Sequence, residues 1–341
     1  MKEIIFQIQV IFRLLQRITM ARIWNLFLLG FSFWFTRISR HYFHRGQPMA
    51  ISLEPTNRCQ LHCPYCPSGA GNLDRPPGKM DVNLFRGIID DIGDKLIHLA
   101  CYFQGEPLLH PGLPGMIQYA RSKGIFTVVS TNGNLIDRDW AERLVLCGLD
   151  HLIISVDGMT EKVYQAYRVG GRLENVLKGI ALIVEAKKEL KKRHPLLEAQ
   201  FVVTRQNEHQ KEAFIYWSKS SGVNHYTLKS AQLDLDRESI QWIPEDRRYA
   251  RYRVDDTGNT QIKNPLKNHC TRVWTTPVVT WDGKVLPCCF DKTGRYPYGD
   301  ATIDRIPEIW KSVPADRFRK RVFTKRKEID ICTNCSEGLR H

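Results

Sequence analysis

The chain of 341 residues is 43% hydrophobic and 25% charged, which excludes an intrinsically disordered protein and allows one large globular domain or two. Its ten cysteines gather at positions 59/63/66, 288/289 and 332/335, with three others apart. Such grouping is typical of metal ligation in a reducing compartment and argues against a secreted disulfide framework, so we expect a cytoplasmic protein.

The first 47 residues predict a basic helical segment. Aliphatic residues recur there at the three- and four-residue steps of an amphipathic helix: Ile4, Ile8, Ile11, Leu15 and Ile18. An uncharged, aromatic-rich run from Ile23 to Thr36 follows. Its 14 residues fall short of the roughly 18–20 that a membrane-spanning helix needs.

Two hypotheses for this segment stay open. It either lies at the membrane interface, with aromatic side chains inserted and arginines facing anionic lipid, or packs on the rest of the chain as an ordinary helical hairpin. The side chains that would insert are Trp24, Phe27, Phe31, Trp34 and Phe35. The first hypothesis predicts a peripheral protein at the inner face of the membrane, attached through residues 1–47.

From residue 48 to 235 strand-like and helical patterns alternate, which predicts a parallel sheet covered by helices. The predicted strands are Ala50–Glu54, Ile97–Phe103, Phe126–Ser130, His151–Val156, Ala199–Thr204 and Asn224–Leu228. The predicted helices are Val82–Gly93, Pro114–Lys123, Arg138–Cys147, Leu173–Lys192 and Glu208–Ser221. Six such units are fewer than the eight of a closed barrel, so we expect an α/β fold of a partial, TIM-like kind.

Three cysteines follow the first predicted strand at a C-x3-C-x2-C spacing: Cys59, Cys63 and Cys66. Three thiolates on one loop can hold three corners of a [4Fe–4S] cluster and leave the fourth iron without a protein ligand. A structural zinc site normally has four ligands, so zinc explains this loop poorly.

Polar motifs follow the next strands, at the end of a barrel where catalytic residues gather. Gly105 and Glu106 come after the second strand, in Gln104-Gly-Glu-Pro107. Ser130 and Asn132 end the third strand, and Ser155 and Asp157 end the fourth. Arg168 follows in Tyr167-Arg-Val-Gly-Gly, and Asn207 comes after the fifth strand.

A polar stretch, residues 236–267, is interpreted as a connection to a small domain at 268–341. This domain contains Cys270, Cys288, Cys332 and Cys335, and Trp281-Asp-Gly-Lys predicts a hairpin turn between the first two. Four thiolates can enclose either a second iron–sulfur cluster or a zinc ion, and the residues alone leave both open. Cys101 and Cys147 are expected to be small core residues.

The cysteine triplet, with Tyr65 in an aromatic position before the last cysteine, resembles the signature of the radical S-adenosylmethionine (SAM) superfamily. The resemblance implies a partial (β/α)6 barrel and a [4Fe–4S] cluster whose open iron binds SAM. It also implies cofactor contacts from Tyr65, Gly105, Glu106, Ser130, Asn132, Ser155, Asp157 and Arg168, with Asn207 as a weaker adenosine-side candidate. Gln104 departs from the superfamily's Gly-Gly-Glu-Pro segment, which is tolerable if backbone contacts bind the cofactor.

The late cysteines resemble the SPASM/twitch extension of these enzymes. This resemblance favours a second, auxiliary [4Fe–4S] cluster on Cys270, Cys288, Cys332 and Cys335 over zinc, and favours Cys288 over its neighbour Cys289 as the ligand. The chain holds no further cysteines for another cluster, so it looks like the shorter, one-cluster form.

We therefore expect an enzyme that reductively cleaves SAM to a 5′-deoxyadenosyl radical and abstracts hydrogen from a small-molecule or lipid/sugar-type substrate. An external donor such as flavodoxin or ferredoxin would supply the electron, and the auxiliary cluster could accept a second electron in an oxidation. The alternatives are a maturase that modifies ribosomal peptides and a non-catalytic iron–sulfur or zinc protein acting in electron transfer or nucleic-acid binding. We do not expect nucleic acid as a partner.

Overall fold

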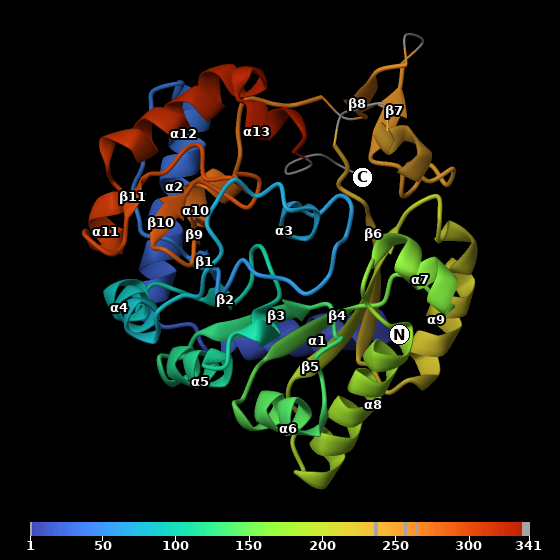
Figure 1. The fold of residues 1–341 in the computed structure, drawn as a ribbon. Coiled ribbons are helices and arrows are strands. Elements are labelled where there is room, and N and C mark those ends of the chain that lie inside the picture. Colours follow the sequence, from blue (N-terminus) through green and yellow to red (C-terminus); the bar gives the residue numbers. More distant parts are fainter. Residues whose placement is uncertain (1, 235–237, 256–257, 264, 336–341) are drawn as a thin grey trace.

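One curved sheet organises the computed structural model, which describes residues 2–234, 238–255, 258–263 and 265–335 (Figure 1). Within these residues the sheet has nine strands in the order β11-β10-β9-β1-β2-β3-β4-β5-β6, and β1 to β6 are all parallel. These parallel strands are β1 Ala50–Leu53, β2 His98–Ala100, β3 Phe126–Thr131, β4 His151–Ser155, β5 Leu196–Val203 and β6 His225–Ser230.

Helices cover the convex side of this sheet because each presents an apolar stripe to it. They are α4 Val82–Ile92, α5 Leu113–Ser122, α6 Arg138–Leu146, α8 Leu173–Glu189 and α9 Lys211–Ser220. In α4 the buried stripe is Phe85, Ile88, Ile89 and Ile92, and the Asp81 carboxylate caps the helix by accepting from two backbone N–H groups. The predicted partial (β/α)6 barrel is confirmed, with β5 beginning at Leu196, ahead of the expected Ala199.

The C-terminal hairpin continues the same sheet. Strand β9 (Val278–Val279) pairs in parallel with β1, while β10 (Lys284–Leu286) and β11 (Gly299–Asp300) run antiparallel. The predicted turn at Trp281–Lys284 therefore exists, and it carries Cys288 to the barrel edge that also bears the Cys59 loop. Residues 336–341 of the predicted C-terminal domain lie outside the described residues.

Shorter elements connect and cover these strands. Between the barrel strands lie α3 Pro67–Ala70, η1 Pro107–Leu109, α7 Glu161–Tyr167 and η2 Glu208–Gln210. After the barrel come η3 Glu238–Trp242, β7 Tyr252–Val254, β8 Thr260–Ile262, α10 Arg272–Thr275, α11 Ile306–Ile309, α12 Val313–Lys325, η4 Arg326–Glu328 and α13 Asp330–Thr333.

Helix α1 (Lys2–Leu15) crosses the concave side of the sheet near the N-terminal ends of its strands (Figure 1). Val10 and Leu14 pack there against Phe126 and Val128 of β3 and Ile153 of β4. Helix α2 (Met20–Ser39) follows after a bend of 108° and packs through Leu29 and Phe33 on Trp274, just before β9. Both helices therefore lie at the bottom of the barrel, opposite the C-terminal strand ends.

Arg13, Arg17 and Arg22 bind the protein, which corrects the expectation that they face lipid, whereas Arg37 of α2 is exposed. Arg13 and Arg17 both reach Asp150, in the loop before β4. The Arg22 guanidinium donates to the carbonyls of Gly93, Lys123 and Gly124, in the loops before β2 and β3. The outward side chains are instead large and apolar. Among the described helices, none alone is long and apolar enough to cross a membrane; α1 and α2 meet that criterion only as a bent pair.

Candidate active site

The Cys59–Cys66 loop leaves the C-terminal end of β1 and turns across the barrel mouth. Cys63 is buried, while Cys59 and Cys66 are half-buried. The Cys66 amide donates to the Cys63 carbonyl at 3.2 Å, and the His62 amide donates to Val169 at 2.8 Å, beyond α7. The loop is therefore fixed both internally and to the segment that carries Arg168.

Gly105 and Glu106 lie against this loop. Gly105 has φ of +76°, and a Cβ there would come within 2.5 Å of the Thr56 carbonyl oxygen, so the close approach of the two backbones requires glycine. The buried Glu106 carboxylate accepts from the Thr131 hydroxyl at 2.6 Å and from the Asn132 amide at 2.8 Å. Burial raises its pKa despite these hydrogen bonds. The ends of β2 and β3 are thereby tied together.

Asn132 connects Glu106 to the first cysteine, Cys59. Its Nδ2 atom donates to the Cys59 Sγ atom at 3.8 Å, and its Oδ1 atom accepts from Gln60 at 3.2 Å. The structure thus brings together Cys59, Glu106 and Asn132, as the sequence predicts for one site.

Arg168 makes the equivalent connection for the second cysteine. Its Nε atom donates to the Asp157 carboxylate at 2.5 Å, and its Nη1 atom donates to the Cys63 Sγ atom at 3.9 Å. Asp157 is fully buried and also accepts from the Val202 amide at 2.7 Å. Burial would lower the pKa of Arg168, but Asp157 and Cys63 hold it well above its usual value. A guanidinium is therefore fixed at the mouth beside a cysteine sulfur.

The remaining predicted contacts differ in their surroundings. Ser130 and Ser155 share the concave face of the sheet with Phe126 and Ile153, because alternate strand residues point the same way. Tyr65 packs edge-on against Trp242 of η3, with ring centroids 5.5 Å apart.

Asn207, the weaker adenosine-side candidate, lies in the turn after β5. Its amide donates to the carbonyls of Asp157 and Val202, and its oxygen accepts from the Thr204 amide. Asn207 thus closes the turn after β5, as a buried side chain with its groups satisfied.

The C-terminal cysteines form a second, more enclosed set. Cys270, Cys288, Cys332 and Cys335 are all buried. Burial raises the pKa of the Cys288 thiol well above its usual value, and Cys289, Cys270 and Cys335 contribute to the shift. Cys289 itself is half-buried. Cys101 and Cys147 are buried in the main hydrophobic core, as predicted.

Sequence reasoning missed Arg326, which lies against this second set. It is 1% exposed, and its Nη2 atom donates to the Cys335 Sγ atom at 3.6 Å. Burial alone would lower the pKa of Arg326, but Cys270, Cys335 and Cys332 raise it overall. It lies in a basic stretch of the sequence, residues 317–327, where no local pattern distinguishes it from exposed neighbours such as Lys325 and Lys327.

Sequence reasoning also missed the buried pair of Glu54 and Arg75. Both guanidinium Nη atoms donate to the carboxylate, at 2.7 and 2.8 Å. Arg75 also donates to the Lys292 carbonyl, so the pair joins the end of β1 to the segment after Cys288. Since it links distant parts of the chain, spacing in the sequence carries no sign of it.

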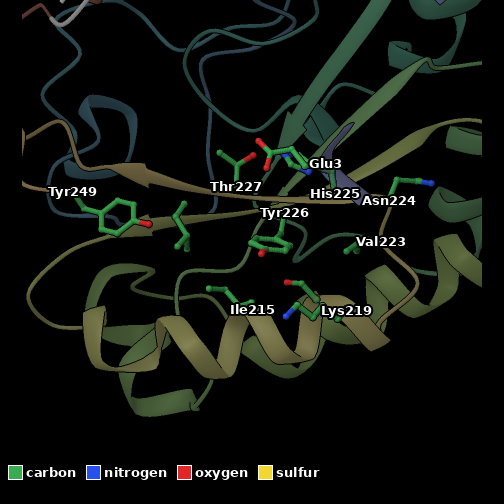
Figure 2. A pocket seen from close by; sticks show the side chains of 11 residues that line it. Glu3, Ile215, Lys219, Val223, Asn224, His225, Tyr226, Thr227 and Tyr249 are labelled. Carbon is green, nitrogen blue, oxygen red and sulfur yellow. The ribbon is translucent and has the colours of Figure 1, made fainter. Parts of the chain in front are cut away.

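A cavity of about 270 Å³ lies between the two cysteine sets. Its lining includes Cys66 and Tyr65 from the first loop, and Lys292 and Asn334 from the C-terminal part, with Asp234 at the end of the barrel segment. Burial lowers the pKa of Lys292. A larger cavity, of about 770 Å³, lies between β6 and α9 and is lined by Tyr226, Lys219 and their neighbours (Figure 2). None of the candidate residues lines that larger cavity.

The first donor set fits an iron–sulfur cluster better than a zinc ion. Cys59, Cys63 and Cys66 can hold three corners of a [4Fe–4S] cluster, whereas a structural zinc site needs a fourth ligand. Among the described residues, no three His, Cys, Asp or Glu side chains come close enough to hold one metal ion. Burial raises the pKa of the Cys59 thiol to about 12, so cluster binding would displace a proton there.

Two family models match the chain. The Radical SAM superfamily matches residues 53–199, and an iron–sulfur cluster-binding domain, SPASM, matches residues 270–336. The two matches cover the barrel strands and the C-terminal cysteines respectively.

Two curated relatives are similar in sequence to this chain over most of its length. The tungsten-containing aldehyde ferredoxin oxidoreductase cofactor-modifying protein of Pyrococcus furiosus is 28% identical over 84% of this chain and 86% of its own length. The PqqA peptide cyclase of Granulibacter bethesdensis is 27% identical over 79% of this chain and 75% of its own length.

Solved structures share the fold. Streptococcus suis SuiB bound to S-adenosylmethionine superposes with a TM-score of 0.62 at 14% identity, over 85% of this chain and 72% of that chain. BtrN in complex with AdoMet and 2-DOIA gives a TM-score of 0.54 at 18% identity, over 87% of this chain and 95% of that one. The chain therefore belongs to the radical SAM superfamily, as an enzyme whose cofactors are SAM and iron–sulfur clusters, the auxiliary one in a C-terminal SPASM domain.

Proposed function

We propose that the barrel mouth binds SAM on a [4Fe–4S] cluster held by Cys59, Cys63 and Cys66, and that a hydrogen atom is then abstracted from the substrate. The observation that carries this proposal is the pair of contacts that place Asn132 beside Cys59 and Arg168 beside Cys63. When bound, the cluster and SAM supply the 5′-deoxyadenosyl radical. The chain's own residues position them and keep water away.

Within this site each side chain has a proposed task. Arg168, held by Asp157, would pair with the SAM carboxylate through its guanidinium. The buried, negatively polarised oxygens of Glu106 lie where an ammonium group would be favoured. Further proposed contacts are Tyr65, Gly105, Ser130, Ser155 and Asp157.

The second cluster would be held by Cys270, Cys288, Cys332 and Cys335. Four buried thiolates fill every iron position, so this cluster has no place for a cosubstrate and suits electron transfer. Cys288 is favoured over Cys289 because it is the more buried and interacts with Cys270 and Cys335. We propose a two-electron oxidation: after hydrogen abstraction the substrate radical would lose a proton to solvent and pass one electron to this cluster. The corresponding domain division is 1–47, 48–235, 236–267 and 268–341.

The substrate is proposed to enter the cavity between the two cysteine sets. Its lining combines Cys66 with charged and amide side chains of Asp234, Lys292 and Asn334, which suit a polar molecule. A small molecule or a lipid-linked sugar headgroup would satisfy these groups. The electron for SAM cleavage would come from an external donor such as flavodoxin or ferredoxin.

A peptide is the second candidate substrate, and the relatives favour it. One matching relative is a PqqA peptide cyclase, and SuiB has also been solved bound to the precursor peptide SuiA. A peptide segment could reach the same cavity, whose lining includes Tyr65, Asp234 and Lys292.

Anaerobic reconstitution tests the proposed function. The protein should bind about eight irons, as two four-iron clusters, and should release 5′-deoxyadenosine from SAM upon reduction. Four irons or fewer without 5′-deoxyadenosine would instead support a passive metal protein. Deuterium transfer from labelled candidate substrates into 5′-deoxyadenosine would then distinguish a peptide from a sugar.

A further inference from the structure

Helices α1 and α2 expose an extended apolar surface, here called the docking face. Trp24 is 60% exposed, Phe27 56% and Trp34 54%, whereas Arg22 on the same helix is only 2% exposed. The docking face consists of Ile4, Ile5, Ile8, Ile11, Phe12, Leu15, Met20, Ile23, Trp24, Phe27, Phe31, Trp34, Phe35 and Ile38. Surface patches of this kind mark interaction sites on soluble proteins.

The docking face arises because both helices have more apolar residues than their inward sides bury. Helix α1 packs inward through Phe6, Val10 and Leu14, yet it exposes a second apolar side. Helix α2 buries several polar side chains beside Leu29 and Phe33. Among them, Arg22 binds three carbonyls of the loops below β2 and β3, and Ser32 accepts from the Trp274 indole at 3.0 Å. These contacts fix α2 to the barrel and leave its larger apolar side outward, whereas an ordinary surface helix buries that side.

The composition of the docking face fits a lipid surface. Trp24, Phe27, Phe31 and Phe35 form a row of stacked rings with centroids 5.3 to 6.1 Å apart. Aromatic rows of this type occur at the boundary between headgroups and acyl chains.

Basic residues border the docking face. Arg37 lies over the Trp34 ring at 4.8 Å, and Arg45 over the Phe43 ring at 4.7 Å. The exposed Arg193, in the loop before β5, lies beside α1 and binds Arg13 through its carbonyl. Glu3 is the single acid of the first 50 residues. An apolar centre with a cationic border complements an anionic bilayer.

We propose that the docking face inserts into the headgroup and outer acyl region of an anionic membrane, with α1 and α2 lying in its plane. The buried polar contacts of both helices, and the bend of 108° between them, favour attachment at the surface over crossing. The cysteines of the mouth lie at the opposite strand ends, so the active site faces the aqueous side. This inference goes beyond the proposed function and does not depend on it.

Vesicle co-sedimentation of the full chain tests the proposal. Binding should be strong to vesicles of phosphatidylcholine with about one-third phosphatidylglycerol and weaker to phosphatidylcholine alone, because the cationic border attracts anionic headgroups. The triple substitution Trp24→Gln, Phe27→Gln and Phe31→Gln should reduce binding at least tenfold. A matched control, Tyr216→Gln with Ile303→Gln, changes side chains that are 79% and 80% exposed elsewhere and should bind like wild type.

Fluorescence quenching by brominated lipids reports which tryptophans contact the membrane, and so how the protein is oriented on it. The wild type should be quenched, and Trp24→Phe with Trp34→Phe should abolish most of the quenching. Of the other six tryptophans, Trp274 and Trp310 are buried, and Trp140, Trp217, Trp242 and Trp281 lie outside α1 and α2. Equal binding by the triple variant would overturn the proposal. So would a stable dimer of the wild type that binds no vesicles, because a second copy would then cover the docking face.

Discussion

The two ends of the barrel use arginine in different ways. At the bottom, Arg22 donates to backbone carbonyls, and Arg17 pairs with Asp150. At the mouth, Arg168 pairs with Asp157 but also reaches the Cys63 sulfur, and Arg326 reaches Cys335. The bottom arginines bind only protein oxygens, whereas those at the mouth also contact cysteines that are proposed to hold clusters.

In this protein the partners of a buried arginine distinguish the two ends: they are backbone carbonyls for Arg22, and they include cysteine sulfurs for Arg168 and Arg326. The arginines at the bottom attach α1 and α2 to the barrel. The apolar sides of these helices then stay exposed and form the docking face. The mouth cations lie beside donor sets suited to clusters carrying negative charge. Substitutions at the two ends should therefore have separable effects.

Cys59→Ala should have the largest effect. It removes one of three cluster ligands, so 5′-deoxyadenosine formation should fall to background and bound iron from about eight to about four per chain. Cys270→Ala should also leave about four irons but retain SAM cleavage. Anaerobic iron analysis and chromatography of the products measure both. If Cys270→Ala abolished cleavage while Cys59→Ala did not, the assignment of the two sets would be reversed.

Arg168→Gln should reduce SAM cleavage roughly 100-fold, about 2.7 kcal/mol, because it removes the proposed charged contact to the SAM carboxylate. It also leaves Asp157 buried without its partner, which should cost about 3–5 kcal/mol of folding stability. The double variant Arg168→Gln with Asp157→Asn should regain stability but not activity. Recovery of both would mean that Arg168 is only structural.

Much of the mouth could be predicted from the sequence. The cysteine spacing is local, and in a parallel sheet Gly105, Asn132 and Asp157 must meet because each follows a strand. The outward orientation of the apolar sides of α1 and α2 could not be predicted in this way. Helical periodicity identifies an apolar side but does not say whether it faces the core or the solvent. The partner groups of Arg22 are backbone carbonyls in distant loops, which no side-chain pattern reveals.

Arg22→Met should lower the free energy of unfolding by about 3 kcal/mol, because buried carbonyls lose charged donors. Cleavage of SAM by the folded variant should stay near that of wild type, since Arg22 lies at the bottom of the barrel. Chemical denaturation and a cleavage assay at low temperature measure the two properties. A selective loss of cleavage without loss of stability would contradict the separation of the two ends.

Acid should lower the stability of the folded protein through His44, which packs between Trp274 and Trp310. Burial, together with the Arg319 charge, lowers its pKa from 6.5 to about 3. The unfolded chain therefore binds a proton between these pH values that the folded chain does not. The free energy of unfolding should fall as pH drops from about 6.5 towards 3, by up to about 1.4 kcal/mol per pH unit. His44→Gln should make this slope shallower; an unchanged slope would exclude His44 as its source.

The most direct test is electron paramagnetic resonance of the reduced Cys270→Ala variant, which retains only the three-cysteine cluster. With SAM carrying a ¹⁵N-labelled amino group, the account predicts a changed signal and a nitrogen coupling, because the cosubstrate binds the iron that lacks a protein ligand. An identical signal with and without SAM, at concentrations that saturate binding, would contradict the account.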